Sequence, residues 1–289
     1  MNTNNLIGQF KQFSIVLKII VINTLIFLIV YLGSFFFKLS PSTLVSWFVL
    51  PTSFLEIVFQ PWSFVTYAFL HAGFWHLFWN MYLLYWFGLY VLNLFTSKRF
   101  LTIYLLGAIN GGLFYVLAYN LFPVFNNISS NLMGASAAVL AIVIFIATYT
   151  PDAMVRIFTF RIKLWQIGLV MVLLDLFQLP SSGNAGGLIA HMGGAIFGYV
   201  YAIHLKKGND IGIWFENFMD LLVNLFKSNK YKHFKQVHKT KQSAPKNTKR
   251  NPTTNHQIKI DRILDKIGKS GYDSLTKAEK DFLFKAGKD

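Results

Sequence analysis

The sequence lacks cysteine altogether. Disulfide bonds, thiolate metal sites and cysteine nucleophiles are therefore excluded. Carboxylates are also scarce, because the first 205 residues contain only Glu56, Asp152 and Asp175. A carboxylate that takes part in chemistry in that part of the chain must be one of these three. The zinc-binding pattern His-Glu-x-x-His does not occur, and we expect neither a metal nor another cofactor.

Apolar residues, in contrast, are abundant. Hydrophobic residues make up 54% of the chain, 30 of its 289 residues are phenylalanine, and the mean hydropathy is +0.45. An ordinary soluble domain is less apolar, so the sequence predicts an integral membrane protein. Residues 206–289 hold 19 of the 27 Lys and Arg residues and 9 of the 12 Asp and Glu residues. This change of composition separates a membrane domain, 1–205, from a polar tail.

Six apolar runs in the membrane domain are long enough to cross a bilayer, which takes about 20 residues of helix. They lie at 15–37, 71–95, 100–121, 133–150, 163–180 and 187–205. The fold class that they predict is an all-α polytopic membrane protein with six transmembrane helices. The first run is too long for the hydrophobic part of a signal peptide, so we expect it to be the first span.

The basic residues of the short loops predict the orientation. With six spans, most of them fall on one side, which the positive-inside rule makes the cytoplasm. These residues are Lys11, Lys18, Lys98, Arg99, Arg156, Arg161 and Lys163. Lys38 lies on the other side. We expect an integral, multi-pass protein of a bacterial plasma membrane with both termini, and the C-terminal tail, in the cytoplasm.

Polar residues collect at the outer ends of three spans. His71, His76 and Asn80 begin the second span, Ser136 the fourth and His191 the sixth. We expect Ser136 about three residues inside its helix, roughly 5 Å at the rise of an α-helix, and His191 about equally deep. Such groups are costly at this depth unless they face a cavity or a partner, so they are candidates for a functional site. Hydrogen bonds between helices are the alternative explanation for each of them taken alone.

Spacing suggests how these groups act together. His76 and Asn80 are four residues apart, so both lie on one face of a helix and could donate hydrogen bonds to a single oxygen. His71 is five residues from His76 and is expected to point away from it, which argues against a zinc site that uses both. The first turn of the fourth span adds free N–H groups and a positive helix end beside Ser136. These donors suit the oxyanion of acyl transfer.

A serine hydroxyl needs a base before it becomes an effective nucleophile, and His191 is the candidate base. Asp175, near the outer end of the fifth span, is the one carboxylate that could complete a triad. We expect it instead to be solvated or at a helix edge, and expect Ser136 and His191 to act as a dyad. Gly194 and Gly198 form a Gly-x-x-x-Gly pattern that lets the sixth and fourth spans approach closely.

In this order, the motifs resemble those of rhomboid intramembrane serine proteases. The matching segments are His71-x-x-x-x-His76-x-x-x-Asn80, Gly134-Ala135-Ser136-Ala137 and Ala190-His191-x-x-Gly194-x-x-x-Gly198. The resemblance covers residues 15–205 and implies the six-helix rhomboid fold. It implies that Ser136 is the nucleophile and His191 the general base. It also implies an oxyanion hole made by His76, Asn80 and the Ser136 backbone. The implied structural supports are His71, Gly134, Gly194 and Gly198.

The function that this resemblance implies is an intramembrane serine endopeptidase that cleaves transmembrane segments of membrane proteins. Peptide bonds within a helix are hydrogen-bonded and covered. We therefore expect single-span substrates with Gly, Pro or other helix-weakening residues near the outer face, and a small residue before the cut. The fifth span has few polar anchors and is expected to move aside to admit the substrate.

Two other functions fit part of the sequence. A catalytically silent rhomboid-like protein that binds transmembrane helices could share the whole fold, although the intact Ser136 and His191 favour an enzyme. A transporter or channel could also place His and Asn in a cavity. It would need no Gly-x-Ser at a helix start, and it would show a repeat symmetry that this sequence lacks.

The tail is predicted to have two parts. Residues 206–259 combine an interfacial amphipathic helix, at 211–226, with a basic linker from Lys227 to Lys259. Residues 260–289 form a small helical segment, in which Thr276-x-x-Glu279 is the pattern of a capping box. We expect the basic tail to lie on the anionic inner leaflet of the bilayer. No recognition motif for nucleic acid occurs, so no nucleic acid partner is expected.

Overall fold

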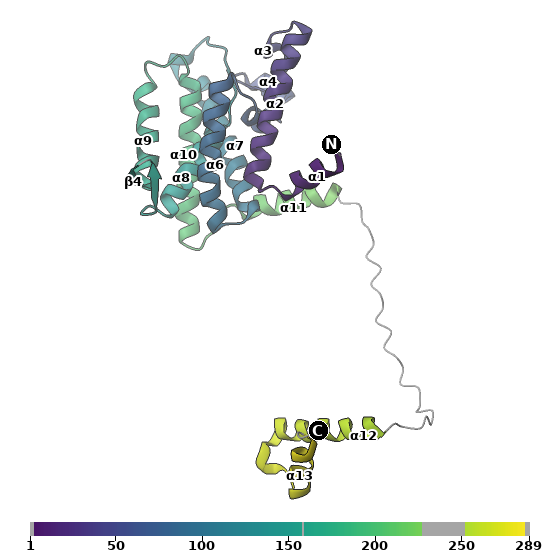
Figure 1. The fold of residues 1–289 in the computed structure, drawn as a ribbon. Coiled ribbons are helices and arrows are strands. Elements are labelled where there is room, and N and C mark those ends of the chain that lie inside the picture. Colours follow the sequence, from purple (N-terminus) through teal and green to yellow (C-terminus); the bar gives the residue numbers. More distant parts are fainter. Residues whose placement is uncertain (1–2, 158, 227–251, 287–289) are drawn as a thin grey trace. The chain divides into compact units, whose positions relative to one another are not determined.

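The computed structural model describes residues 3–157, 159–226 and 252–286. These residues are mostly helical (Figure 1), and they belong to two compact units, 1–228 and 229–289. Within these described ranges, three helices are long and apolar enough to cross a membrane: α2 (Ile15–Phe37), α7 (Ser97–Leu121) and α10 (Ala185–Lys206). Two shorter apolar helices accompany them: α8 (Ser136–Tyr149) and α9 (Leu164–Gln178).

One helix overlaps each of the six predicted runs; α2 has the predicted bounds, whereas α7 and α10 begin before their runs. The sixth of these helices is α6 (Phe74–Leu94). The other helical elements of the first unit are α1 (Thr3–Gln12), α3 (Pro41–Val45), α4 (Phe54–Phe59), α5 (Ser63–Thr66), η1 (Tyr67–Phe69), η2 (Pro123–Phe125) and α11 (Ile213–Phe226). The domain boundaries predicted at residues 205 and 259 stay predictions.

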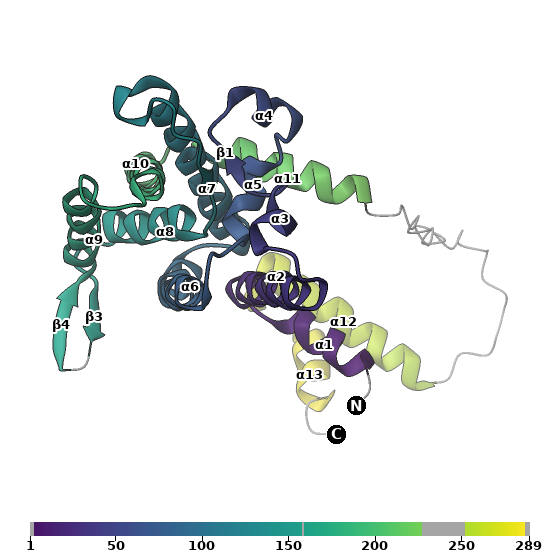
Figure 2. The same cartoon turned by 90° about the horizontal axis from the view of Figure 1, so that it is seen from above.

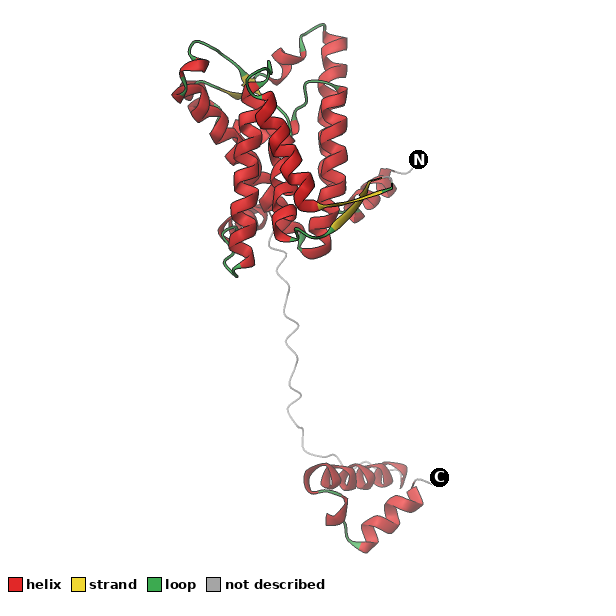
Figure 3. Ribbon diagram, turned by 90° about the vertical axis from the view of Figure 1, so that its left-hand side faces the viewer, coloured by secondary structure: helices red, strands yellow, loops and turns green. Residues whose placement is uncertain are grey.

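Two small β pairs correct the expectation of an all-α fold; they are drawn as arrows in Figure 3. β1 (Leu50–Pro51) pairs antiparallel with β2 (Asn131–Leu132), and β3 (Met154–Ile157) pairs antiparallel with β4 (Phe160–Lys163). The first pair joins the segment between α2 and α6 to the residues before α8. The second is a hairpin between α8 and α9. In both pairs, backbone N–H and C=O groups that lie outside the helices find hydrogen-bond partners on the opposite strand.

α8 is the central helix of the first unit. Every side chain from Ala137 to Ala147 is buried, and α6, α7, α9 and α10 all contact this helix (Figure 2). A helix that is apolar on all its faces needs neighbours that cover each of them. The buried residues of α2 and α9 are far fewer: Val16, Ile19 and Asn23 on α2, and Leu164 and Gly168 on α9.

Glycines bring α10 close to the backbone of α8. A Cβ built on Gly194 would lie 2.1 Å from the Ala137 oxygen, and one built on Gly198 would lie 2.3 Å from the Ala141 oxygen. Real Cβ atoms essentially never come this near, so only hydrogen fits at these two positions. These contacts join the two helices for which the Gly-x-x-x-Gly pattern predicts a close approach.

The Cβ atoms of the same two alanines, Ala137 and Ala141, face glycines of α7. A Cβ built on Gly111 would lie 2.5 Å from the Cβ of Ala137, and one built on Gly107 would lie 2.5 Å from the Cβ of Ala141. Each alanine is therefore held between two glycines, one from each neighbouring helix. This double contact fixes how α8 stands between α7 and α10.

Ion pairs fasten α11 to the first turn of α7. Arg99 pairs with Asp210 and, at 3.4 Å, with Glu216 on α11. Lys98 pairs with Asp220 at 2.5 Å. These ion pairs hold one face of α11 against the start of α7.

The other face of α11 is apolar and exposed. Trp214, Phe218 and Leu221 are 60%, 46% and 59% exposed. A helix with one charged face and one exposed apolar face is typical of a membrane surface. The helix falls inside the predicted amphipathic stretch, 211–226.

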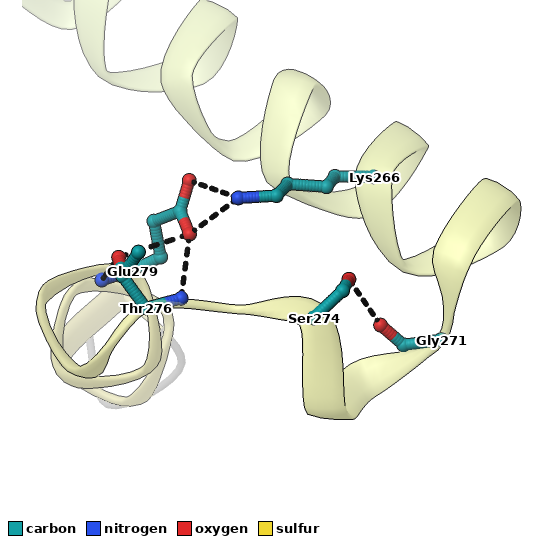
Figure 4. A network of polar contacts seen from close by, with 5 residues as sticks. All are labelled: Lys266, Gly271, Ser274, Thr276 and Glu279. Carbon is teal, nitrogen blue, oxygen red and sulfur yellow. Dashed lines mark hydrogen bonds and ion pairs between the residues drawn. The ribbon is translucent and has the colours of Figure 1, made fainter.

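The second unit consists of α12 (Pro252–Ser270), η3 (Tyr272–Ser274) and α13 (Lys277–Ala286). The Thr276 backbone N–H donates to Glu279 Oε2 at 2.8 Å, and the Glu279 backbone N–H donates to Thr276 Oγ1 at 3.4 Å (Figure 4), so the predicted capping box is confirmed. Lys266 of α12 donates to the same carboxylate oxygen at 2.9 Å. This contact ties the start of α13 to α12.

The N-terminal end of α12 differs from the prediction. The helix begins at Pro252, so residues 252–259 are helical where the sequence predicted a linker. Proline suits the first turn of a helix, because its missing N–H would have no partner there. The rest of the predicted linker, 227–251, lies outside the described residues.

Candidate active site

A cavity of about 720 Å³ lies at the end of the first unit where α8 begins. Four of the predicted site residues line it: His76, Asn80, Ser136 and His191. Asp175 of α9 lines it as well. The structure therefore brings side chains from four helices together, although they are far apart in the sequence. His71 lines a neighbouring cavity of about 280 Å³.

Ser136 is the first residue of α8, so the prediction that it lies about three residues inside the helix was wrong. Its N–H belongs to the first turn, where N–H groups have no partner within the helix. Gly134, two residues earlier, has φ +135°, a value that favours glycine. The Gly134 N–H donates to the backbone carbonyl oxygen of Tyr67 at 3.0 Å, and this hydrogen bond holds the turn in place. The turn leaves the hydroxyl and the N–H of Ser136 at the start of a helix, where a developing anion is favoured.

The ring of His76 lies over Gly134. A Cβ built on Gly134 would lie 2.7 Å from His76 Cε1 and 2.8 Å from Nε2, so the ring requires glycine there. The Ala72 backbone N–H donates to His76 Nδ1 at 3.4 Å, which leaves Nε2 to carry the proton of the neutral ring. The same Cβ position lies 3.6 Å from Ser136 Oγ. His76 can therefore offer an N–H donor beside the serine.

Asn80 lies one turn after His76 on α6 and is 6% exposed. Its Nδ2 donates to the His76 backbone oxygen at 2.8 Å. A side-chain amide carries two N–H groups, so one bond leaves a second donor for the cavity. Both side chains line the cavity, in keeping with their spacing of four residues on one helix.

His191, on α10, makes its side-chain hydrogen bond with Asp175. Nδ1 of His191 lies 2.9 Å from Oδ2 of Asp175, and the two side chains are 21% and 15% exposed. The expectation that Asp175 is solvated or at a helix edge was wrong. The sequence signalled only that a carboxylate inside an apolar run needs a partner, without naming His191.

Ser136 and His191 line the same cavity. Among the described residues, no hydrogen bond joins Ser136 Oγ to the His191 ring. In enzymes without substrate such bonds are often long and tighten only in the complex. The arrangement therefore places a hydroxyl and an imidazole, the two kinds of group that a nucleophile and base pair needs, in one cavity.

The position of His71 also differs from the prediction. The ring centroids of His71 and His76 lie 5.1 Å apart and the rings meet edge to face, at 70°. The prediction that they point away from one another assumed that both residues are helical, but α6 begins at Phe74. His71 is buried, and neither of its ring nitrogens has a hydrogen-bond partner among the residues that the structure describes. It packs behind the His76 ring at the start of α6.

The groups around the cavity suit acid–base chemistry. Asp175 is the carboxylate of its lining, and no Lys or Arg is among the described residues that line it. Across the described ranges, no group of three or more His, Asp or Glu side chains could hold a metal. What the cavity offers is a hydroxyl, an imidazole with a carboxylate behind it, and N–H donors from a side-chain amide, an imidazole and a helix start. These are the parts that acyl transfer requires.

Two family models match parts of the chain. A family of unknown function (DUF6576) matches residues 247–285, which include all of α12 and most of α13. No curated protein matches the chain. The Rhomboid domain matches residues 58–208, which are more than half of the chain and contain every residue of the candidate site. This domain implies a polytopic membrane fold, in agreement with the apolar helices. The chain therefore belongs to the rhomboid family, which includes serine proteases.

Proposed function

We propose that the protein is an intramembrane serine endopeptidase that cleaves transmembrane segments of membrane proteins. The observation that carries the proposal is the shared cavity, in which Ser136 and His191 meet the donors of His76 and Asn80. Membership of a family that includes serine proteases supports it. No cofactor is required, because the side chains supply nucleophile, base and oxyanion donors.

The first half of the reaction forms an acyl enzyme. His191 Nε2 accepts the proton of Ser136 Oγ while that oxygen attacks the carbonyl carbon of the substrate peptide bond. The carbonyl oxygen becomes an oxyanion. Nε2–H of His76, Nδ2–H of Asn80 and the Ser136 backbone N–H donate hydrogen bonds to it. His191 then gives its proton to the leaving amine as the C–N bond breaks.

The second half releases the other product. Water loses a proton to His191 as its oxygen attacks the acyl carbon, the same donors hold the new oxyanion, and Ser136 leaves as the proton returns to its Oγ. The active form of the site therefore needs His191 Nε2 unprotonated and facing Ser136 at the start of each half.

For the membrane arrangement we place α2, α6, α7, α8, α9 and α10 across the bilayer, with both termini in the cytoplasm of a bacterial cell. The cavity lies at the start of α8. Lys98 and Arg99 lie in the first turn of α7, and Arg161 lies on β4, between the end of α8 and the start of α9. Figure 1 shows β4 and α11 at the opposite ends of these helices from the cavity. In this arrangement the cavity opens near the outer face, and α11 lies on the anionic inner leaflet with its exposed apolar side in the lipid.

Substrate enters between α6 and α9. Trp75 and Trp79 of α6 and Met171 and Leu174 of α9 line the cavity, so each of its two walls offers apolar side chains that match a transmembrane segment. α9 buries little of its surface, as its two buried residues indicate, so it can move aside with little loss of packing. A helix-weakening residue in the substrate exposes the peptide bond, and a small residue before the cut fits beside Ser136.

The test uses purified protein in liposomes with a single-span substrate. We expect the wild type to cleave it, and Ser136→Ala and His191→Ala to abolish cleavage and labelling by a fluorophosphonate probe. Ser46→Ala removes an exposed hydroxyl outside the cavity and is the matched control, which should behave as the wild type. Cleavage or labelling that persists in Ser136→Ala would refute the assigned nucleophile.

One observation favours a second function, a catalytically silent protein that binds transmembrane helices. Among the described residues no hydrogen bond joins Ser136 to His191, and a catalytically silent protein would need no such bond. Its signature would be a folded wild type that co-purifies with single-span proteins but cuts none of a varied set and takes up no probe.

A further inference from the structure

Asp175 is the one carboxylate in the lining of the cavity, and its partner is the base of the proposed reaction. The 2.9 Å between Asp175 Oδ2 and His191 Nδ1 is the length of a charge-assisted hydrogen bond. Both side chains are mostly withdrawn from solvent, at 15% and 21% exposed. A carboxylate placed inside an apolar helix has a cost, which a partner offsets.

This bond decides which ring nitrogen of His191 holds the proton. A carboxylate accepts a hydrogen bond and cannot donate one, so Nδ1 must carry hydrogen when it faces Asp175. Nε2 of the neutral ring is then unprotonated, and only this form can take the proton of Ser136. When the ring becomes positively charged during the reaction, the carboxylate also stabilises that charge.

A purely structural role of Asp175 would explain the same contact. Asp175 stands on α9 and His191 on α10, so the pair could do no more than hold two helices together. α9 has Leu164 and Gly168 as its buried residues, and both are near its other end. A purely structural bond would change stability and substrate binding, whereas a bond that orients the base would change the rate of the chemical step.

We propose that Asp175 is a positioning residue for His191, which makes the catalytic group a Ser136, His191 and Asp175 triad in place of a dyad. The proposal rests on the proposed function. In Asp175→Asn the amide can present its N–H to the ring, which favours the wrong tautomer, with Nε2 protonated.

The experiment measures kcat, KM and the rate of fluorophosphonate labelling for the wild type, Asp175→Asn and Asp175→Glu in liposomes. We expect kcat and the labelling rate of Asp175→Asn to fall together by roughly 10- to 100-fold, less than for a fully buried triad acid because this pair is partly exposed. KM and the apparent unfolding temperature should stay close to those of the wild type. Asp175→Glu, which keeps the charge on a longer side chain, should recover part of the rate.

Glu56→Gln supplies the matched control, since it makes the same chemical change at an exposed carboxylate on α4. Its kcat should equal that of the wild type. An active wild type with unchanged kcat in Asp175→Asn would overturn the triad and leave the proposed function intact. A loss confined to KM or to stability, or no recovery in Asp175→Glu, would also overturn it. A folded wild type that neither cleaves nor takes up probe would overturn both proposals.

Discussion

Gly194 lies directly against the backbone of Ala137, one residue after the proposed nucleophile. A Cβ on Gly194 would be 2.1 Å from the Ala137 oxygen and 2.9 Å from its carbonyl carbon. Since both are backbone atoms, no change of rotamer can make room. α10, which carries the proposed base, can therefore lie this close to α8, which carries the proposed nucleophile, only because Gly194 has no side chain.

Gly194→Ala should separate α10 from α8. Forcing a methyl group into a packed interior costs about 1–3 kcal/mol, and a backbone clash belongs at the upper end. We expect a lower free energy of unfolding in a detergent titration and little residual activity. Gly183→Ala, at a position with nothing within 4 Å of the added Cβ, is the control and should change neither. Equal stability of the two variants would contradict the packing argument.

Gly134→Ala should damage the oxyanion site more than the fold. The added methyl group would press on the His76 ring, and φ +135° would strain any residue other than glycine. Loss of one oxyanion donor lowers kcat by about 10²- to 10³-fold, and we expect a fall of this size. Gly73→Ala is the comparison, because Gly73 has φ −176° and open space. A Gly134→Ala enzyme with wild-type kcat would show that the His76 ring is free to shift.

Joining α6 to α9 should block entry of the substrate. The natural chain has no cysteine, so Trp79→Cys and Leu174→Cys introduce the only two thiols. After reaction with a bis-maleimide, cleavage of a single-span substrate should be lost, while labelling by the small fluorophosphonate persists. Each single variant treated in the same way controls for modification alone. Undiminished cleavage by the cross-linked protein would exclude entry between these helices.

Two neighbouring cations should contribute unequally to the docking of α11. The Arg99 side chain is 24% exposed and its partners 17% and 16%, whereas Lys98 and its partner are 53% and 46% exposed. Arg99→Ala should lower the free energy of unfolding by about 1–3 kcal/mol and speed hydrogen exchange in α11. Lys98→Ala should cost less than about 1 kcal/mol, because water screens an exposed pair. Similar effects of both substitutions would refute this difference.

Acid should loosen the second unit. Hydrogen bonds from the Thr276 backbone, from Lys266 and from the Thr276 hydroxyl lower the pKa of Glu279 from 4.5 to about 2. A carboxylate with a lower pKa in the folded state stabilises it above the unfolded pKa and loses this effect as pH falls through the folded pKa. We therefore expect protection of α13 from hydrogen exchange, measured on the whole protein, to decline between pH 4.5 and 2. Glu279→Gln should show weaker protection at neutral pH and a flatter response to acid across that window.

Much of the fold could be predicted because its helices are continuous apolar runs. α2 has the predicted bounds, and the capping box at Thr276 was readable from two residues. The β1–β2 pair was missed, since two residues in each strand give no alternating pattern. The start of α12 was missed because residues 252–257 offer no apolar residue except proline, so hydropathy gave no sign of a helix there.

The candidate site was predicted by residue type and less well by position. Ser136 was placed too far inside its helix because residue 135 is alanine, which gives no capping signal, and the apolar run continues across the true start. The orientation of His71 was predicted wrongly because the predicted span began at residue 71, whereas α6 begins at Phe74. The contact of Asp175 with His191 depends on how α9 is rotated against α10, and no local pattern encodes that angle.

The burial of α8 shields the helix that begins with Ser136, the proposed nucleophile, from the lipid. Side chains from Ala137 to Ala147 are covered by protein, while α2 and α9 present most of their surface outward. A thicker or thinner bilayer, or one with different acyl chains, therefore acts first on those outer helices and reaches Ser136 only through them. Lipid composition should govern how readily a substrate arrives, and leave the chemistry at the serine largely unchanged.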